Sequence, residues 1–169
     1  MTQPNLPPHR PAAGRRVAGH AQEDHIRDPY QLRQNLSDHT IRPQCGALYH
    51  NGRWQWALRP EEGPEVLCSA CRRINDKSPA GIVTFHGGFA PQQVNEIVHL
   101  ARHQEEAEKS EHPLNRIISV DEEAEGIVIY TPDIHLPRRI GEAAKRAFHG
   151  TLQEHFDKGG YFVRIDWRA

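Results

Sequence analysis

Short apolar or alternating runs, each bounded by turn residues, recur through the second half of the chain. They occupy residues 81–86, 116–120, 126–131 and 161–167. The acidic segment between the second and third runs has the composition of a turn. This pattern predicts four strands, with the middle two joined as a hairpin.

Two stretches with helical spacing separate these strands. Pro91 suits the first position of a helix that continues to about Ser110 and ends before Pro113. Asp133 can cap a second helix. The apolar stripe of this second helix recurs every four residues and is followed by a Gly-Gly pair; it consists of Ile140, Ala144, Phe148, Leu152 and Phe156.

The resulting order is strand, helix, strand, strand, helix, strand, which is that of the ferredoxin-like βαββαβ fold. We therefore predict a ferredoxin-like domain at residues 80–169. Residues 1–22 are polar and rich in proline, which is typical of a disordered tail. Residues 23–79 remain for a smaller module, so the expected fold class is α+β with two parts.

All three cysteines of the chain lie in that smaller module. Cys68 and Cys71 are two residues apart, as in a metal-binding turn, and Cys45 lies in a Pro-x-Cys-Gly turn of the same kind. Thiolates at such turns suit tetrahedral zinc. A complete second pair would place a cysteine at position 42, where Arg42 stands. The sequence predicts a zinc-ribbon-like module with three cysteine ligands.

Charge and length narrow the classes of function. The chain has 169 residues, with 21 Lys and Arg against 22 Asp and Glu, so nucleic-acid binding would depend on a local basic patch. We find no apolar leader and no apolar run of membrane length, and we expect no membrane partner. An odd number of cysteines fits a reducing compartment. We therefore expect a cytoplasmic protein.

Two tryptophans alternate along residues 52–56, which places Trp54 and Trp56 on one face of a strand. One interpretation makes them the core of the small module, because large aromatic side chains dominate small cores. The other makes them a platform on which nucleotide bases stack. The basic residues that would accompany such a platform are Arg53, Arg72 and Arg73.

The second predicted helix carries a cluster of cations. Acids outnumber bases over residues 81–131, and bases outnumber acids from residue 132 onward. The cluster predicts a ridge that binds phosphates. The alternative is a solvated face on which Glu142 pairs with a cation four residues later. The ridge consists of Arg138, Arg139, Lys145 and Arg146.

Catalysis is the less supported class of function. Glu96, His99 and His103 fall near one face of the first predicted helix, and His112 follows its end. The HExxH order of a metalloprotease is absent, as are a phosphate-binding loop and a GxSxG motif. We expect a non-enzymatic protein, with a hydrolase that uses these His and Glu groups as an alternative.

Several blocks between residues 24 and 169 carry a resemblance to known proteins. They include Pro43-Gln-Cys-Gly-Ala, Gly52-Arg-Trp-Gln-Trp, Cys68-Ser-Ala-Cys-Arg-Arg, Glu111-His-Pro-Leu-Asn-Arg, Thr131-Pro-Asp-Ile-His-Leu-Pro-Arg-Arg and Val163-Arg-Ile-Asp-Trp-Arg. These blocks resemble a family of small proteobacterial zinc-ribbon proteins. That family is similar to part of the archaeal and eukaryotic export adaptor of the large ribosomal subunit, and some members carry a generic ATPase label.

The resemblance implies binding to the ribosome or to structured RNA, in translation control or in ribosome storage under stress. It also implies a zinc site on Cys45, Cys68 and Cys71. Because the family has a cysteine where Arg42 stands, three versions of the site stay open: His39 completes it, His50 completes it, or packing holds it without metal. The remaining alternative for the function is an adaptor that binds a protein partner.

Overall fold

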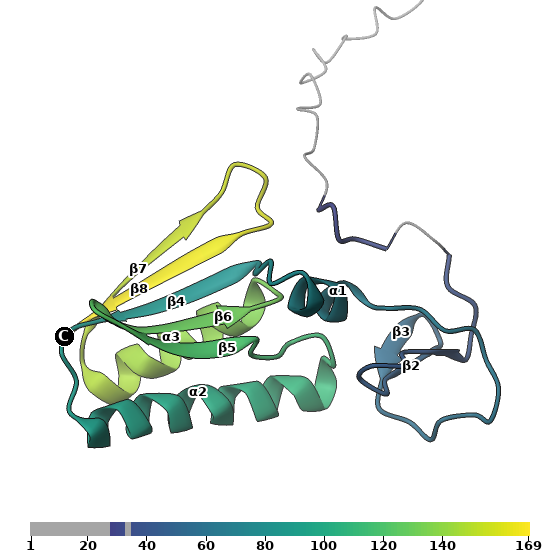
Figure 1. Ribbon diagram of the computed structural model, residues 1–169, viewed down its shortest axis with the longest axis horizontal. Helices are drawn as coiled ribbons and strands as arrows, with labels where there is room; N and C mark the ends of the chain where they lie inside the picture. Colours follow the sequence, from purple (N-terminus) through teal and green to yellow (C-terminus); the bar gives the residue numbers. More distant parts are fainter. Residues whose placement is uncertain (1–27, 33–34) are drawn as a thin grey trace, which may run out of the picture.

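The computed structural model of the chain describes residues 28–32 and 35–169, so the expected tail at residues 1–22 lies outside the described part. Figure 1 shows a small sheet beside a larger layer of strands and helices. The elements, in chain order, are β1 (Thr40–Ile41), β2 (Leu48–His50), β3 (Arg53–Gln55), α1 (Ser69–Asn75), β4 (Gly81–His86), α2 (Pro91–Glu111), β5 (Ser119–Glu123), β6 (Gly126–Thr131), α3 (His135–Phe148), β7 (Thr151–Phe156) and β8 (Val163–Arg168).

The described strands form two sheets. β1, β2 and β3 make a small antiparallel sheet, and the larger sheet has the order β5-β6-β4-β8-β7. In the larger sheet β4 runs parallel to β8, whereas the other neighbouring pairs are antiparallel. α2 and α3 pack side by side on one face of this sheet (Figure 1). The prediction of an α+β chain is therefore confirmed.

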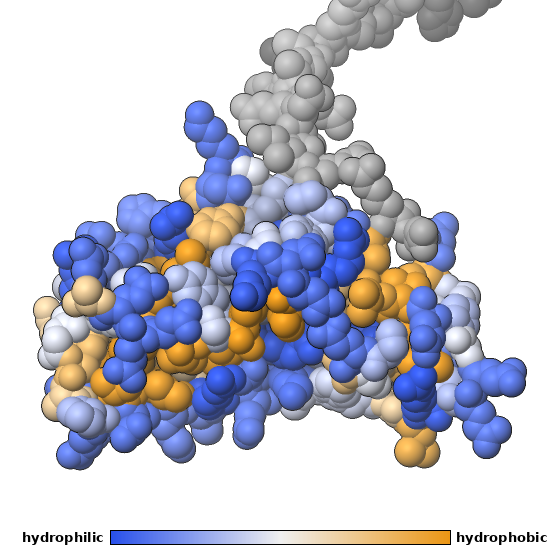
Figure 2. Space-filling view, in the orientation of Figure 1, coloured by the Kyte–Doolittle hydropathy of each residue, from blue (hydrophilic) through white to orange (hydrophobic). Residues whose placement is uncertain are grey.

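Alternation along the central strands separates a buried face from an outer face. On β4, Val83 and Phe85 point toward the helices and are fully buried. Ile127 and Ile129 of β6 lie opposite these two residues and complete the same layer. At the surface, hydrophilic side chains interrupt the hydrophobic residues across the face that Figure 2 shows.

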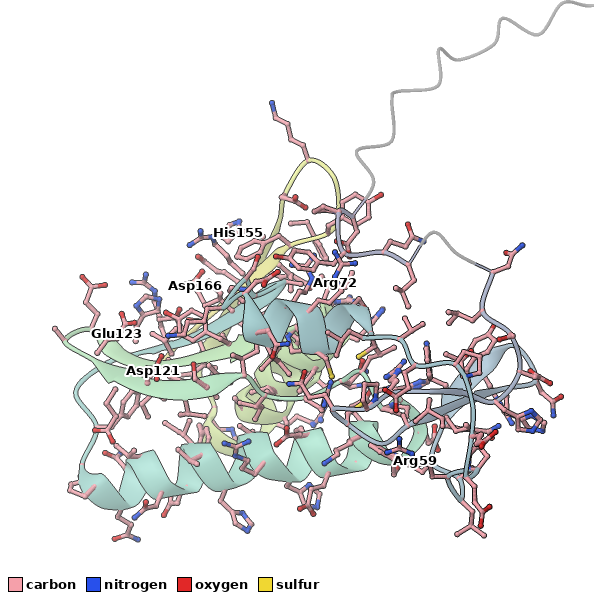
Figure 3. The ribbon with its side chains drawn as sticks, turned by 45° about the vertical axis from the view of Figure 1, so that its right-hand side comes forward. Arg59, Arg72, Asp121, Glu123, His155 and Asp166 are labelled. Atoms are coloured by element: carbon pink, nitrogen blue, oxygen red, sulfur yellow. The ribbon has the colours of Figure 1, made fainter. Side chains whose placement is uncertain are left out.

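The outer face of the sheet is polar. His86 Nε2 lies 2.6 Å from Asp166 Oδ1 between the adjacent strands β4 and β8. Asp121 and Glu123 extend this polar surface along β5 (Figure 3). The aromatic residues of the central strands do not form a stacking platform there, because Phe85 is buried and Tyr130 donates its hydroxyl to Glu123. In the described part of the chain, the central strands therefore offer Tyr130 to the outer face but no pair of aromatic rings of the kind on which RNA bases stack.

The helix α2 begins and ends as its sequence predicts. Pro91 occupies its first turn, and the side chain of Gln93 accepts a hydrogen bond of 2.9 Å from the Ala90 amide. The helix ends just before Pro113, and it buries Ile97 and Ala101. Neither α2 nor another helix in residues 28–32 and 35–169 has the length and apolar character that a membrane crossing requires.

The predicted extent of the second helix is wrong. α3 ends at Phe148, and residues expected in its last turns form the strand β7, which pairs with β8. His149 takes a left-handed backbone with φ of 54°, and Gly150 lies so close to Trp167 that a Cβ there would stand 2.3 Å from the indole. Pairing with β8 and this close approach override the four-residue apolar spacing.

Asp133 lies two residues before α3, and its carboxylate caps the first turn of the helix. Its Oδ1 accepts hydrogen bonds of 2.8 Å from the amides of His135 and Leu136. Its Oδ2 is buried and has no hydrogen-bond partner among the described residues. Burial raises the pKa of Asp133 to about 6, although the two amide hydrogen bonds act in the opposite direction.

This carboxyl should make stability depend on pH. Because folding raises the pKa of Asp133, the protonated carboxyl contributes fully to the stability of the fold below the pKa of the unfolded chain, near 4. This contribution is lost as the pH rises through about 6. We expect a loss of about 3 kcal/mol in the free energy of unfolding. Asp133→Asn should remove this loss, whereas Asp157→Asn, at an exposed turn, should keep it. Urea unfolding between about pH 4 and pH 7 measures the difference, and an unchanged slope in Asp133→Asn would contradict the assignment.

Candidate metal centre and binding groove

The three cysteines meet in a single cluster. Their Sγ atoms all lie within 4.8 Å of one another, and no disulfide joins them. Cys68 and Cys71 are fully buried, whereas Cys45 is half-buried. Two sulfurs bound to one tetrahedral zinc ion lie about 3.8 Å apart, given a Zn–S bond near 2.3 Å. The cluster is therefore compatible with a metal site.

Two different local structures supply the sulfurs. Cys45 lies in the turn between β1 and β2, where the Gly46 amide donates to the Arg42 carbonyl and Gly46 has a φ of 79°. Cys68 is the N-cap of α1, and its sulfur accepts a hydrogen bond of 3.3 Å from the Cys71 amide. Cys68 and Cys71 therefore begin a helix, whereas the sequence predicts a turn.

Two arginines surround the sulfurs. Arg42 is fully buried, with Nη1 3.8 Å from Cys45 Sγ and its guanidinium carbon 3.5 Å from the centre of the Trp54 ring. Arg116 Nη2 lies 3.3 Å from Cys71 Sγ and 3.9 Å from Cys68 Sγ. Arg42 Nε and Nη2, and Arg116 Nε, are buried without a hydrogen-bond partner in the described residues. Sulfur is thus the electrostatic partner of both cations.

These contacts shift the pKa values of Cys45 and Cys68 in opposite directions. A hydrogen bond from Cys68, with smaller help from the Ala47 amide and the Arg42 guanidinium, lowers the pKa of Cys45 to about 4. The same hydrogen bond and burial raise the pKa of Cys68. Burial lowers the pKa of Arg42. Burial is the largest single influence on Arg116 and opposes its charge, but the hydrogen bond to Cys71 and the charges of all three cysteines together raise the pKa of Arg116.

Neither candidate for a fourth ligand reaches the cluster. The cysteines are the one group of potential metal ligands found in residues 28–32 and 35–169. The exposed His39 packs against His50, with ring centres 5.1 Å apart, and His50 Nδ1 faces Asp38 Oδ2 at 3.5 Å. At position 42 a guanidinium, which cannot ligate, takes the side of the cluster where a fourth cysteine is expected. The donor set fits zinc in softness and falls one ligand short in number.

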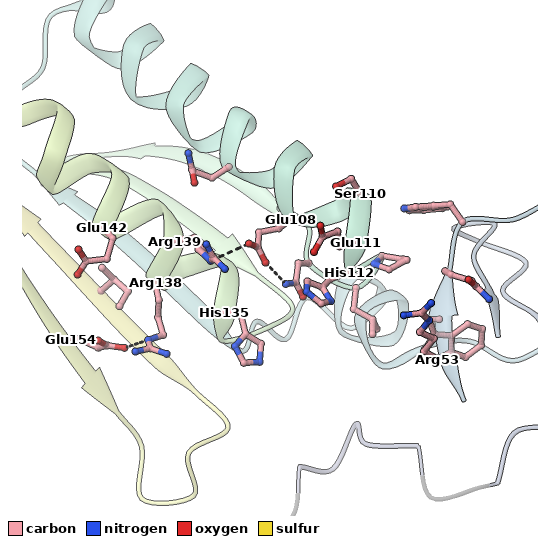
Figure 4. Close-up of a pocket in the computed structure, with 18 of the residues that line it drawn as sticks. Arg53, Glu108, Ser110, Glu111, His112, His135, Arg138, Arg139, Glu142 and Glu154 are labelled. Atoms are coloured by element: carbon pink, nitrogen blue, oxygen red, sulfur yellow. Dashed lines mark hydrogen bonds and ion pairs between the residues drawn. The ribbon is translucent and has the colours of Figure 1, made fainter. Parts of the chain in front are cut away.

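A groove with a volume of about 1310 Å³ runs between the small sheet and the helices. Its walls come from β3, the end of α2, the segment that follows α2, α3 and β7. Figure 4 shows Arg53 and His112 toward one end and Arg138 and Glu154 toward the other. The groove is therefore built from segments far apart in the sequence.

Six of the nine predicted nucleic-acid contacts line this groove. They are Arg53, Trp54, Trp56, Arg138, Arg139 and Arg146. Lys145 is exposed on α3 but is not among the lining residues. Arg72 is half-buried on α1, with its guanidinium 5.5 Å from the Tyr30 ring.

Arg73 is a structural residue. Only 5% of it is exposed, and its Nη2 donates a hydrogen bond of 2.7 Å to Asp28. Its Nη1 lies within 3.4 Å of the carbonyls of Ser78 and Pro79, and its guanidinium stacks on Tyr30. These contacts leave little of Arg73 for a phosphate, and its contact with nucleic acid stays a prediction.

The two tryptophans combine structural contacts with partial exposure. Trp54 packs between Arg42 and the edge of Tyr49, whose ring centre is 5.2 Å away. Trp56 remains 41% exposed and donates its indole N–H to the Lys109 carbonyl at 2.7 Å, which joins the small sheet to the end of α2. Both indoles therefore hold the module together while an edge of each lines the groove.

The charges in the groove are mixed. Glu108 pairs with Arg139 at 3.0 Å and also accepts a hydrogen bond from Asn115. Glu154 pairs with Arg138 (Figure 4). Arg53 and Arg146 are exposed and have no ion pair in the part of the chain that the structure describes. These two arginines are therefore the free cations of the groove.

The histidine and glutamate groups proposed for a hydrolase do not assemble. Glu96, His99 and His103 are exposed on α2 and lie outside the groove. His112 lines the groove, where His135 of α3 also lies. The structure therefore separates the four residues on which that alternative depends.

Arg116 is the residue of the cluster that the sequence does not identify. It precedes an apolar run that predicts a strand from residue 116, but β5 begins at Ser119. The hydrophobic Leu114, which packs on the cysteines, brings this segment to the cluster. An arginine just before an apolar run is too common a pattern to mark a sulfur contact.

None of the protein-family models, curated proteins or solved structures compared with this chain gives a significant match.

Proposed function

We propose that this chain is a non-enzymatic, cytoplasmic RNA-binding protein that holds structured RNA, such as an exposed part of the ribosome, in the groove between β3 and α3. The observation that carries the proposal is that candidate residues from opposite ends of the chain line one groove. Arginines contact phosphates, and partly exposed indoles can stack on bases.

The size and charge of the groove support a macromolecular ligand. Its volume of about 1310 Å³ exceeds the roughly 300–1,000 Å³ of small-molecule pockets. Arg53 and Arg146 are free to meet phosphates at once. Arg138 and Arg139 would exchange a carboxylate for a phosphate, which makes binding moderate in strength and strongly dependent on salt.

The proposal includes an assignment of the two parts of the chain. β4, α2, β5, β6, α3 and β8 would form the ferredoxin-like unit, and the pairing of β8 with β4 on the side opposite β6 supports this strand order. β7 is an added edge strand between α3 and β8, and it reverses the direction of β8, which runs parallel to β4 where a ferredoxin-like sheet is antiparallel. The small sheet and the cysteine cluster would form the zinc-ribbon-like module that the family resemblance implies. The cellular setting that follows is translation control or ribosome storage under stress.

The test measures binding of the full chain to a labelled RNA hairpin by fluorescence anisotropy over a series of salt concentrations. The double variant Arg53→Glu with Arg146→Glu should weaken binding by more than about 10-fold and reduce the magnitude of the salt slope by about 2. The matched control is Arg164→Glu with Lys158→Glu, which reverses two exposed cations outside the groove. Equal losses in both variants would contradict a role for the groove.

Sedimentation of the tagged chain from cell lysate through a sucrose gradient tests the ribosomal partner. We expect the protein to move with ribosomal particles at low salt and to leave them at moderate salt. A chain that stays at the top at both concentrations, while a protein partner follows it, would replace this proposal with the adaptor alternative.

A further inference from the structure

The cysteine cluster has a donor set that differs from that of a four-ligand zinc site. Cys45, Cys68 and Cys71 supply three sulfurs within 4.8 Å of one another, and neither predicted histidine joins them. Structural zinc sites have four ligands in nearly all cases. Some soft ions accept three thiolates and do not need a fourth ligand, and copper(I) is the foremost of them.

Arg42 closes the remaining side of the cluster. Its side chain is fully buried and lies flat on Trp54, with Nη1 3.8 Å from Cys45 Sγ. A guanidinium donates hydrogen bonds and has no free lone pair, so it can stabilise a thiolate but cannot bind a cation. The residue that replaces a ligand therefore excludes a fourth donor from this side.

The buried charges favour a monovalent ion. Arg42 and Arg116 bring two positive charges to the sulfurs, and neither makes an ion pair with a carboxylate in the part of the chain that the structure describes. Three thiolates with a monovalent cation carry a net charge of −2, which the two guanidiniums neutralise. With a divalent cation, one positive charge would remain buried without compensation, which is costly.

We propose that Cys45, Cys68 and Cys71 form a three-coordinate site for copper(I), with Arg42 and Arg116 as buried counter-cations that donate N–H groups to the sulfurs. Each sulfur that still carries a proton releases it to solvent as the ion binds, and the ion keeps its oxidation state. Outer-shell hydrogen bonds of this kind orient ligands and tune metal affinity. The site adjoins the RNA groove, because Trp54 lines the groove and also contacts Arg42.

The test uses the full chain, reduced, metal-free and under anaerobic conditions. Copper(I) is titrated in competition with bicinchoninate, and zinc in competition with a chromophoric zinc chelator. X-ray absorption of the copper-loaded chain counts the sulfur ligands. We expect one equivalent of copper(I), bound by three sulfurs, and loss of this binding in Cys68→Ser.

Two variants test separately the effect of the number of thiolate ligands and the effect of the arginine charge. Arg42→Cys supplies a fourth thiolate, so zinc affinity should rise by more than about 100-fold while copper(I) affinity rises far less. Arg116→Gln keeps an N–H donor but removes a charge, and copper(I) affinity should fall by about 10- to 100-fold, with a smaller effect on zinc. Circular dichroism confirms that each variant is folded.

Three results would overturn the proposal. The first is a wild-type chain that binds zinc as tightly as Arg42→Cys does. The second is a copper-loaded chain with a nitrogen or oxygen ligand beside the sulfurs. The third is a folded, reduced chain that retains neither ion, which would leave a cluster held by packing alone.

Discussion

The substitution Gly126→Ala should cost at least about 4 kcal/mol of folding free energy, the largest effect that we expect from a single methyl group in this chain. Gly126 begins β6 and pairs with His86 of β4. Its φ of 140° is one that alanine rarely adopts, and a Cβ would stand 1.8 Å from the Phe85 carbonyl oxygen. The central strands would have to separate to admit it.

Gly88→Ala is the matched control for this effect. Gly88 lies two residues beyond β4, and a Cβ there would have nothing within 4 Å. We expect a change within about 0.5 kcal/mol. Urea unfolding followed by circular dichroism compares the two variants with the wild type. A Gly126→Ala chain as stable as the control would show that the two central strands do not approach as described.

Arg73→Met should cost about 3 kcal/mol of folding free energy while leaving the RNA affinity of the folded chain unchanged. Arg73 connects α1 to the segment at Asp28 through an ion pair of 2.7 Å, with 7% and 24% of the two side chains exposed. Methionine keeps most of the volume but removes three hydrogen bonds and leaves the Asp28 carboxylate without its cation.

Arg72→Met provides the comparison on the same helix. Arg72 is half-buried, and its described contact is a distant stacking on Tyr30, so we expect a loss below about 1 kcal/mol. Urea unfolding and RNA anisotropy are measured for both variants. If Arg73→Met weakened RNA binding without a loss of stability, the sequence prediction of a phosphate contact would be correct after all.

The apolar pattern of the sequence was sufficient to predict most of the strands and helices of the larger sheet. Residues 81–86 and 126–131 form strands with the predicted limits, and α2 extends one residue beyond its predicted end. The strand β7 could not be predicted from the apolar pattern, because its apolar residues continue the helical spacing of α3. What distinguishes β7 is the contact of Gly150 with Trp167, a tertiary feature.

The two candidate sites differ in how far sequence spacing predicts them. The cysteine cluster follows from ligand spacing, because the turn at Cys45 and the first turn of α1 with Cys68 and Cys71 bring the thiolates together. The role of Arg42 depends on a stack with Trp54, and that of Arg116 on a segment 45 residues after Cys71. The groove could not be predicted, since it exists only where β3 meets α2 and α3.

The outermost strand β5 has a consequence for how copies of this chain behave together. An edge strand offers unpaired amides and carbonyls to which another molecule can add a strand. β5 ends in three exposed carboxylates, Asp121, Glu122 and Glu123. A second β5 that paired with this edge would bring its own carboxylates close to these, in register if it ran parallel and at Asp121 if it ran antiparallel, and the like charges would repel. This acidic edge therefore protects the sheet from growing into an aggregate at the high local concentrations of a crowded cell.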